Sequence, residues 1–459
     1  MSNLFSLLSV ARDALSAQSA GLDVAGRNLA NATTPGYSRR VARLETQGLV
    51  GGAGGGVRFA GEGRAADRLI ERRLSTELGR QGSASARRDA LRDVESSLFS
   101  GGSFPVAQRL NDLSKAWSTL AQSPSDASAR ASVLSRATEL AAQIADASTS
   151  LRNASGDVVA RASGVASEVN ERLAAIADLN GKIAAAQGAG EGDGDLRDRR
   201  DILAREVAER TGATPVEDAS GGLTLLAGGI SIVEGGRAAK LEAGLDASGS
   251  LVFSASRPGM AAAPLKGELM GGTLGGLRQA NEQDIKPMRA ALNQLAGDVA
   301  TAFNAEHASG VGLDGTGGRP LFSFNGASPD PAASLRIDPA MEGHPERLAA
   351  GQAPGETGDG SVALRLADVA FKASAGGQSL SDRVASFAGT FGTTLASADN
   401  EASLRADTVA QADAARESLV GVSVEEEMVA MTRFQRAFEA TTRVLRTADE
   451  LLSDFLRGI

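Results

Sequence analysis

Both ends of the chain carry long runs in which mostly apolar residues recur with alternating spacings of four and three. The first run occupies residues 4–29, at Leu4, Leu8, Ala11, Leu15, Gln18, Leu22, Ala25 and Leu29. The second occupies residues 430–455, at Ala430, Phe434, Ala437, Thr441, Val444, Ala448, Leu451 and Phe455. This spacing keeps one stripe of a helix against a partner helix along its whole length. We therefore expect a long helix with a coiled-coil seam at each end of the chain.

The C-terminal run has a second apolar row one residue over, at Met431, Phe438, Leu445 and Leu452. An ordinary amphipathic helix lying on a globular core would explain either terminal run taken alone. Two seams of similar length instead favour an antiparallel hairpin that pairs the two ends of the chain. Because one partner helix cannot cover two adjacent rows, we expect the rest of the C-terminal face to be buried against further copies.

The segments between the ends are mostly helical. Residues 64–98 are expected to form a helix that "SGGSFP" interrupts, and residues 106–210 to form several long polar helices with thin apolar seams. Trp117 is expected to be a core anchor. A helix should end before Pro124, with Ser125 and Asp126 able to cap the next one.

The residue pattern changes from residue 212 to 280, where short runs of alternating apolar and polar residues are separated by glycine-rich turns. Helix is expected again over 274–310, loops with a strand over 311–365, and helix from about Ser379. The fold class is therefore mainly α with an inserted β domain. We expect a terminal coiled-coil unit (1–45 and 415–459), a helical stalk (46–210, 274–310 and 366–414) and an outer β-rich domain (211–273 and 311–365).

The first helix is expected to stop within "NLANATTPGYSRR" (28–40). Asn31, Thr34, Pro35 and Gly36 are typical of a turn, and a purely local helix stop would explain them. Such a local stop does not explain Tyr37, which is the one tyrosine of the chain, or the basic pair Arg39 and Arg40 that follows. We interpret this stretch as a hinge anchored by Tyr37, with the Tyr37 ring and the pair Arg39 and Arg40 suited to contacting a neighbouring subunit.

Composition narrows the function classes. Of the 459 residues 42% are hydrophobic but only 3% aromatic, so the cores must be aliphatic. A formal net charge of −9 argues against a nucleic-acid partner. The chain has no cysteine, which excludes disulfides and thiolate metal sites. We find neither a secretory signal-peptide pattern nor an apolar stretch of the roughly 20 residues that a membrane span needs, and we expect no membrane partner.

Candidate chemistry is sparse. "GGAGGG" (51–56) is expected to be a flexible connector, because a short strand rather than a helix follows it. Asp193 and Asp195 have the spacing of a calcium loop, but the later ligand positions do not fit. His307 and His344 are far apart in the sequence, and His307 is expected to be a cap or surface residue. Carboxylates are plentiful, so a paired-carboxylate hydrolase stays open. We predict no catalytic residue, cofactor or metal.

Both ends of the chain resemble one protein family. Asn28, Leu29, Ala30, Asn31, Thr34, Gly36, Tyr37 and Arg39 resemble the N-terminal signature of bacterial flagellar axial proteins, which are rod, hook and hook-associated proteins. Residues 421–456 resemble the C-terminal signature, with matches at Gly421–Ser423, Glu426–Glu427, Phe434–Gln435, Ala440, Val444–Leu445 and Thr447. Two segments of the middle, "DLRDRRDILAREVAERTG" and "LNQLAGDVATAFNAEHASGVGLDG", are similar to hook-associated members of that family.

The resemblance implies a structural adaptor between hook and filament that self-assembles through its terminal helices. The implied partners are further copies in a ring, hook protein, the second junction protein and an export chaperone bound at the C-terminal helix. It also implies export through the flagellum's own type III apparatus without a cleaved signal peptide. Another hook, rod or junction protein, or a scaffold-borne cell-wall hydrolase, remains an alternative. The assembly residues expected are Asn28, Asn31, Thr34, Gly36, Tyr37, Arg39, Phe434, Gln435, Phe438, Val444, Leu445 and Leu452, with Leu4, Leu8, Leu15, Leu22 and Leu29 in the seam.

Overall fold

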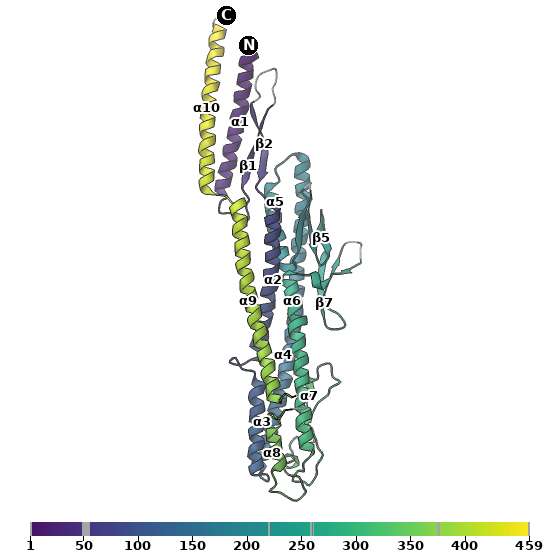
Figure 1. The fold of residues 1–459 in the computed structure, drawn as a ribbon. Helices are drawn as coiled ribbons and strands as arrows, with labels where there is room; N and C mark the ends of the chain where they lie inside the picture. The colour runs from purple at the N-terminus through teal and green to yellow at the C-terminus, as the bar shows by residue number, and fades with distance from the viewer. Residues whose placement is uncertain are drawn as a thin grey trace.

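The chain folds into a long rod of helices with both termini at one end (Figure 1). The computed structural model describes residues 2–47, 56–218, 221–257, 259, 261–373 and 377–457, and the side chains of 2–5, 455 and 456 lie outside it. Small antiparallel sheets lie beside the helices. The fold is therefore mainly α with small β elements, as the sequence predicts. The glycine run expected to be a connector lies outside the described residues, except for Gly56.

The two ends of the chain pair with each other. Helix α1 (Ser2–Ala30) and helix α10 (Val424–Arg457) lie side by side in opposite directions (Figure 1). An antiparallel pair of strands, β1 (Arg40–Thr46) and β2 (Val57–Arg64), packs against α1. We call α1, α10 and these two strands the terminal hairpin. The boundary expected between the terminal unit and the stalk, at residue 45, falls within β1, and β2 on its far side pairs with β1.

The seam of the terminal hairpin is built from small residues rather than from the expected leucines. Ala17, Gly21, Val24 and Asn28 are buried, whereas Leu8, Leu15, Leu22 and Leu29 are only half-buried. A Cβ atom built on Gly21 would lie 2.6 Å from a ring carbon of Phe434, so any larger residue would displace this ring. The leucines flank the seam because the closest approach of the two helices runs along the small residues.

The stalk is a bundle of long helices. It contains α2 (Arg68–Leu98), α3 (Pro105–Gln122), α4 (Ala127–Ala189), α5 (Gly194–Thr211) and α9 (Leu380–Val420). The segment 106–210, which was expected to form several long helices, holds α3, α4 and α5, and α4 alone runs for 63 residues. The Asp126 carboxylate accepts hydrogen bonds from the N–H groups of Ser128 and Ala129, which confirms the expected cap. Trp117 is fully buried in the core, as expected.

The remaining helices complete the far half of the stalk. Helix α6 (Gly272–Gln279) continues through a π-helical segment, η2 (Ala280–Ile285), into α7 (Lys286–Ala308). Helix α8 (Ser361–Asp368) packs against α3 and α7. One apolar core cluster runs through these helices, and its buried members span Ala86 to Ala398 in the sequence. Buried residues of the terminal hairpin, such as Val24, are not part of that cluster.

Two small sheets lie beside α4 at mid-length (Figure 1). Strands β3 (Thr214–Glu217), β4 (Leu223–Ala227), β5 (Ile230–Glu234) and β6 (Arg237–Ala238) form one, and β7 (Lys240–Leu245), β8 (Leu251–Ser256) and β9 (Ala263–Pro264) form the other. Two asparagines of α4 hold them in place, since Asn170 bonds both the N–H and the C=O of Leu241 and Asn180 does the same to Leu223.

The segment 311–365 does not extend these sheets, so the expected outer domain made of 211–273 and 311–365 is not a single body. Its strands β10 (Phe322–Ser323) and β11 (Arg336–Ile337) pair with each other and pack against α7 and α4. Short 3-10 turns lie here (η3, Ala332–Ser334; η4, Pro345–Arg347) and after β9 (η1, Gly267–Leu269). The guanidinium of Arg130 donates to the Leu348 carbonyl at 2.7 Å and fixes this segment at the far end of the stalk. The other domain boundaries stay a prediction.

Candidate functional site

The turn that follows α1 lies where the terminal hairpin meets the stalk. The Thr34 N–H donates to the Asn31 carbonyl at 2.9 Å, and the Tyr37 N–H donates to the Thr34 carbonyl at 3.2 Å. Gly36 has φ of 78°, and a Cβ atom there would lie 2.5 Å from the Ile202 side chain of α5. Glycine is needed at this position for its backbone angle and for the close approach of the stalk.

Asn28 organises the chain around this turn. Its Oδ1 atom accepts hydrogen bonds from the Arg40 N–H at 2.8 Å and from the Tyr37 hydroxyl at 2.9 Å. Its Nδ2 atom donates to the Arg40 carbonyl at 2.8 Å and to Glu427 Oε2 at 3.0 Å. Asn28 is only 1% exposed, and its bonds with Arg40 and Glu427 are buried, while the bond with Tyr37 is partly buried. One amide thus joins α1, β1 and α10.

Tyr37 donates a hydrogen bond as a neutral phenol, and the Arg40 guanidinium lies over its ring. Burial raises the pKa of its phenol above the usual 10.0, which keeps the proton that it donates to Asn28. The Arg40 guanidinium lies 5.0 Å from the centroid of the Tyr37 ring, within the range of a cation–π contact. Tyr37 therefore anchors the turn to its own chain.

Arg39 ties the turn to both C-terminal helices. Its Nε atom donates to Glu427 Oε1 at 2.6 Å, and its Nη1 atom lies 3.0 Å from Glu426 Oε2. Its backbone N–H donates to the carbonyl of Val420, the last residue of α9, at 2.9 Å. The cation that we expected to contact a neighbouring subunit is neutralised within the chain.

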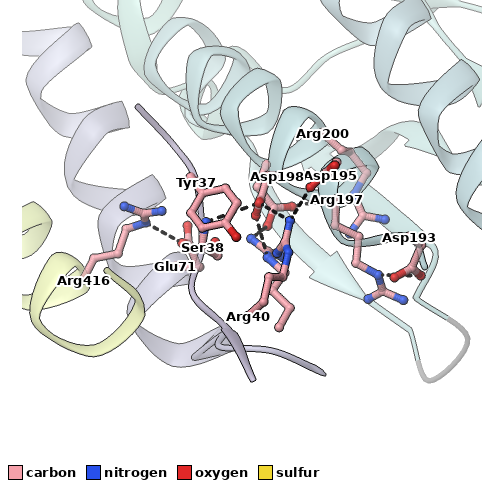
Figure 2. A network of polar contacts seen from close by, with 12 residues as sticks. Tyr37, Ser38, Arg40, Glu71, Asp193, Asp195, Arg197, Asp198, Arg200 and Arg416 are labelled. Carbon is pink, nitrogen blue, oxygen red and sulfur yellow. Dashed lines mark hydrogen bonds and ion pairs between the residues drawn. The ribbon is translucent and has the colours of Figure 1, made fainter. Parts of the chain in front are cut away.

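Arg40 ties the turn to α5 of the stalk (Figure 2). Its Nη2 atom donates to Asp198 Oδ2 at 2.7 Å and to Asp195 Oδ1 at 2.8 Å. Burial opposes the charge of Arg40, but these carboxylates outweigh it and raise its pKa above the usual value of an arginine. Arg64, at the end of β2, lies 2.8 Å from the other Asp198 oxygen. We call Asn28, Tyr37, Arg39, Arg40, Asp198 and Glu427 the hinge network.

A second ion-pair group lies next to the hinge network (Figure 2). Glu71 of α2 accepts from Arg416 Nε of α9 at 2.7 Å and from Arg205 Nη1 of α5 at 3.0 Å. Since the main apolar core does not extend into the terminal hairpin, polar contacts carry much of its attachment to the stalk.

The expected assembly residues of α10 divide into two sets. Phe434, Leu445 and Leu452 are half-buried on the side of α1, whereas Gln435, Phe438 and Val444 are exposed. The exposed fraction is 41% for Phe438 and 49% for Val444. On α1, Leu29 is half-buried at the level of the hinge network, and the side chain of Leu4 lies outside the described residues.

The residues weighed for metal or acid–base chemistry have structural roles. Asp193 pairs with Arg197 at 2.9 Å and Asp195 pairs with Arg40. Among the residues that the structure describes, no group of three or more His, Asp or Glu side chains could hold a metal ion. His307 is buried and not at the surface as expected, because its ring bridges the Arg319 carbonyl and the Ala349 N–H.

Sequence reasoning did not single out Gly21, Asp198 or Glu71. Gly21 lies in the row Ala17, Gly21, Val24 and Asn28, whose 4-3-4 spacing marks a close helix contact that the leucine pattern concealed. Asp198 and Glu71 carry no sequence signal, since their partners are more than a hundred residues away.

Comparisons with known proteins agree with this geometry. Residues 91–322, half of the chain, match the family described as flagellar hook-associated protein FlgK helical domain. The chain belongs to the flagellar hook-associated protein 1 family. As a member of that family it is a structural protein of the bacterial flagellum, an adaptor of the hook–filament junction. Residues 8–37 match the flagella basal body rod protein family, and residues 418–457 match the flagellar basal body rod FlgEFG protein C-terminal family.

The hook-associated protein 1 relatives differ in how much of their length they share with this chain. The chain is 27% identical to flagellar hook-associated protein 1 of Bacillus subtilis, over 100% of the chain and 99% of that protein. It is 29% identical to the Salmonella typhimurium protein over 70% of the chain and 59% of that protein. A solved structure, the flagellar hook junction protein FlgK from Burkholderia pseudomallei, shares the fold with a TM-score of 0.66 at 15% identity, covering 77% of this chain and 100% of that one.

No helix in the described parts of this family member has the length and hydropathy to cross a membrane. Its place in the family makes it a component of the extracellular flagellum that assembles with other axial proteins.

Proposed function

We propose that the terminal hairpin is the assembly element of this adaptor, and that copies pack into a ring through its uncovered apolar side chains. The observation that carries the proposal is the exposure of Phe438, Val444 and Leu451 on α10, at 41%, 49% and 56%. Leu7 of α1 is 45% exposed on the same hairpin. Apolar side chains in such number on one thin helix pair are typical of a surface that another protein covers.

The hinge network supports this proposal because it fixes the hairpin relative to the stalk. A subunit that packs in a ring must present the same surface to each neighbour, and four ordered bonds on Asn28 hold that pose. Repeated weak contacts then make the ring durable, while each single contact stays reversible.

The proposed partners above and below the ring are hook protein and the second junction protein. The support is that both ends of this chain match families of basal body rod proteins, at 8–37 and 418–457. Similar terminal helices in successive axial proteins would stack into one continuous tube wall.

We propose further that the chain leaves the cell through the flagellum's own type III apparatus without a cleaved signal peptide. Before assembly, an export chaperone would cover the exposed residues Phe438, Val444 and Leu451 of α10. The absence of cysteine suits a chain that must travel unfolded through a narrow channel.

We propose no enzymatic activity for this chain, because its family is structural and the hinge carboxylates Asp198 and Glu427 are engaged by arginines. A scaffold-borne hydrolase would instead cleave purified peptidoglycan. Immunogold labelling of a tagged copy at the hook–filament boundary separates this adaptor from a hook, rod or second junction protein.

The test uses cells that make only a variant chain. One variant is Phe438→Asp, on the exposed side of α10, and the other is Leu445→Asp, on its half-buried side. Phe438→Asp should leave the hairpin folded and the chain secreted, yet absent from isolated hook–filament structures. Leu445→Asp should in addition destabilise the hairpin by roughly 2–3 kcal/mol. Normal incorporation of the Phe438→Asp chain would overturn the proposed assembly surface.

A further inference from the structure

Two adjacent stalk helices carry exposed charges that have no partner in the described parts of the chain. Arg72 and Arg73 of α2 are exposed and form no ion pair there, and the same holds for Asp413 of α9. Glu417 of α9 is 62% exposed and has only a 3.4 Å contact with its neighbour Arg416. We call Leu69, Arg72 and Arg73 the basic face of α2, and Asp413 and Glu417 the acidic face of α9.

These charges oppose the electrostatics of their own helices. Helix α2 begins at Arg68, so Arg72 and Arg73 lie just beyond the first turn, where the dipole that favours acidic side chains is already weak. Helix α9 ends at Val420, so Glu417 lies in its last turn, at the end that favours basic ones. Asp413 and Glu417 are also four residues apart, a spacing at which like charges repel. Within the described parts of the subunit, only the 3.4 Å contact of Glu417 with Arg416 offsets this repulsion.

The two faces lie at the same height on the rod. The 2.7 Å ion pair between Arg416 and Glu71 brings the last turns of α9 level with the first turns of α2. The two helices run side by side in opposite directions (Figure 1). In two copies placed side by side without any shift along the rod, the acidic face of one would therefore lie at the height of the basic face of the other.

The basic face also carries an exposed leucine. Leu69 is 76% exposed and lies three and four residues before Arg72 and Arg73, on the same side of α2. An apolar side chain surrounded by charges that suit the other face is the usual make-up of a protein interface.

We propose that the basic face of α2 in one copy binds the acidic face of α9 in the next copy. The contact rests on the proposed self-assembly and identifies its stalk part. It joins two different surfaces, so that repeated copies generate a ring or a helical array rather than a closed dimer.

A charge exchange tests this contact in cells that carry only the variant chain. Arg72→Glu with Arg73→Glu, or Asp413→Arg with Glu417→Arg, should lower incorporation into isolated hook–filament structures about tenfold while secretion into the medium stays normal. The chain with all four substitutions restores opposite charges across the contact and should regain incorporation. All four side chains are exposed, so these substitutions should leave the subunit folded, and normal secretion checks this.

The matched control reverses two other exposed arginines, Arg237→Glu with Arg336→Glu, and should behave like the wild type. Normal incorporation of both charge-reversed chains, failure of the fourfold chain to recover, or an equal loss in the control would each overturn the contact. The Phe438→Asp chain distinguishes the two proposals: if it is absent while the reversed chains incorporate, terminal assembly stands and the stalk contact is wrong.

Cross-linking tests the geometry directly, since the chain has no cysteine of its own. In assembled structures, a chain with Arg73→Cys and Asp413→Cys should oxidise to a ladder of multimers. Cells making the two single-cysteine chains together should give dimers, and either chain alone should give none. A missing ladder and missing mixed dimers would contradict the contact and point to another protein at these faces.

Discussion

Asn28 Nδ2 donates a hydrogen bond to Glu427 Oε2 at 3.0 Å across a separation of 399 residues. The same carboxylate accepts from Arg39 at 2.6 Å, so its charge is balanced where it is buried. Two residues near opposite ends of the chain thereby fix the base of the terminal hairpin.

Replacing Tyr37 by Phe should weaken the hinge network modestly. The phenylalanine ring can still lie beside the Arg40 guanidinium, but Asn28 Oδ1 loses the hydroxyl donor at 2.9 Å. We expect the terminal hairpin to lose about 0.5–1.5 kcal/mol, measured as faster hydrogen exchange of α1 and β1 amides. Unchanged exchange would show that the hydroxyl does not stabilise the turn.

Replacing Asp198 by Asn should loosen the hairpin from the stalk. The side chain of Arg40 is 2% exposed and would lose its buried counter-ion, which costs about 3–5 kcal/mol for a buried pair broken on one side. Asp195→Asn is the matched control, because the side chain of Asp195 is 84% exposed and should matter little. Protease sensitivity of the segment 31–39 measures both. Equal sensitivity of the two variants would contradict the role of Asp198.

Replacing Gly21 by Val should separate α1 from α10. The new side chain would overlap the ring of Phe434, whose carbons lie 2.6–2.8 Å from the Cβ position. We expect a loss of roughly 1–3 kcal/mol in hairpin stability, measured by thermal unfolding. Adding Phe434→Ala removes the clash and should recover part of that loss. A double variant less stable than either single variant would show that the two residues do not meet.

Acidification should destabilise the stalk through His307. Burial lowers the pKa of this imidazole below its usual 6.5, and the neutral ring accepts a hydrogen bond from the Ala349 N–H. The unfolded chain therefore binds the proton more readily, so stability is complete above about pH 6.5 and falls as the pH drops from there toward the folded pKa.

The free energy of unfolding measured by urea between about pH 7 and pH 5 checks this dependence. His307→Gln should flatten it, and His344→Gln should not, because His344 is half-exposed beside Glu346. An equal slope in the His307→Gln chain would assign the effect to other groups.

Local patterns predicted much of the fold because they act over neighbouring residues. The heptad spacing predicted the two terminal helices, Pro124 and Asp126 set the boundary between α3 and α4, and Trp117 was recognised as core. The same local rules misplaced His307, since its partners Arg319 and Ala349 lie in a loop that folds back from farther along the chain.

By itself the sequence determined the helical class, the pairing of the two ends and the family, because periodicity and signature residues are written in the order of the chain. Only the tertiary structure decided which atoms meet at the base of the hairpin. Arg39 and Arg40 looked free for a neighbour, but Glu427 and Asp198 reach them from 388 and 158 residues away. Ion pairs depend on distance in space, which a sequence pattern does not specify.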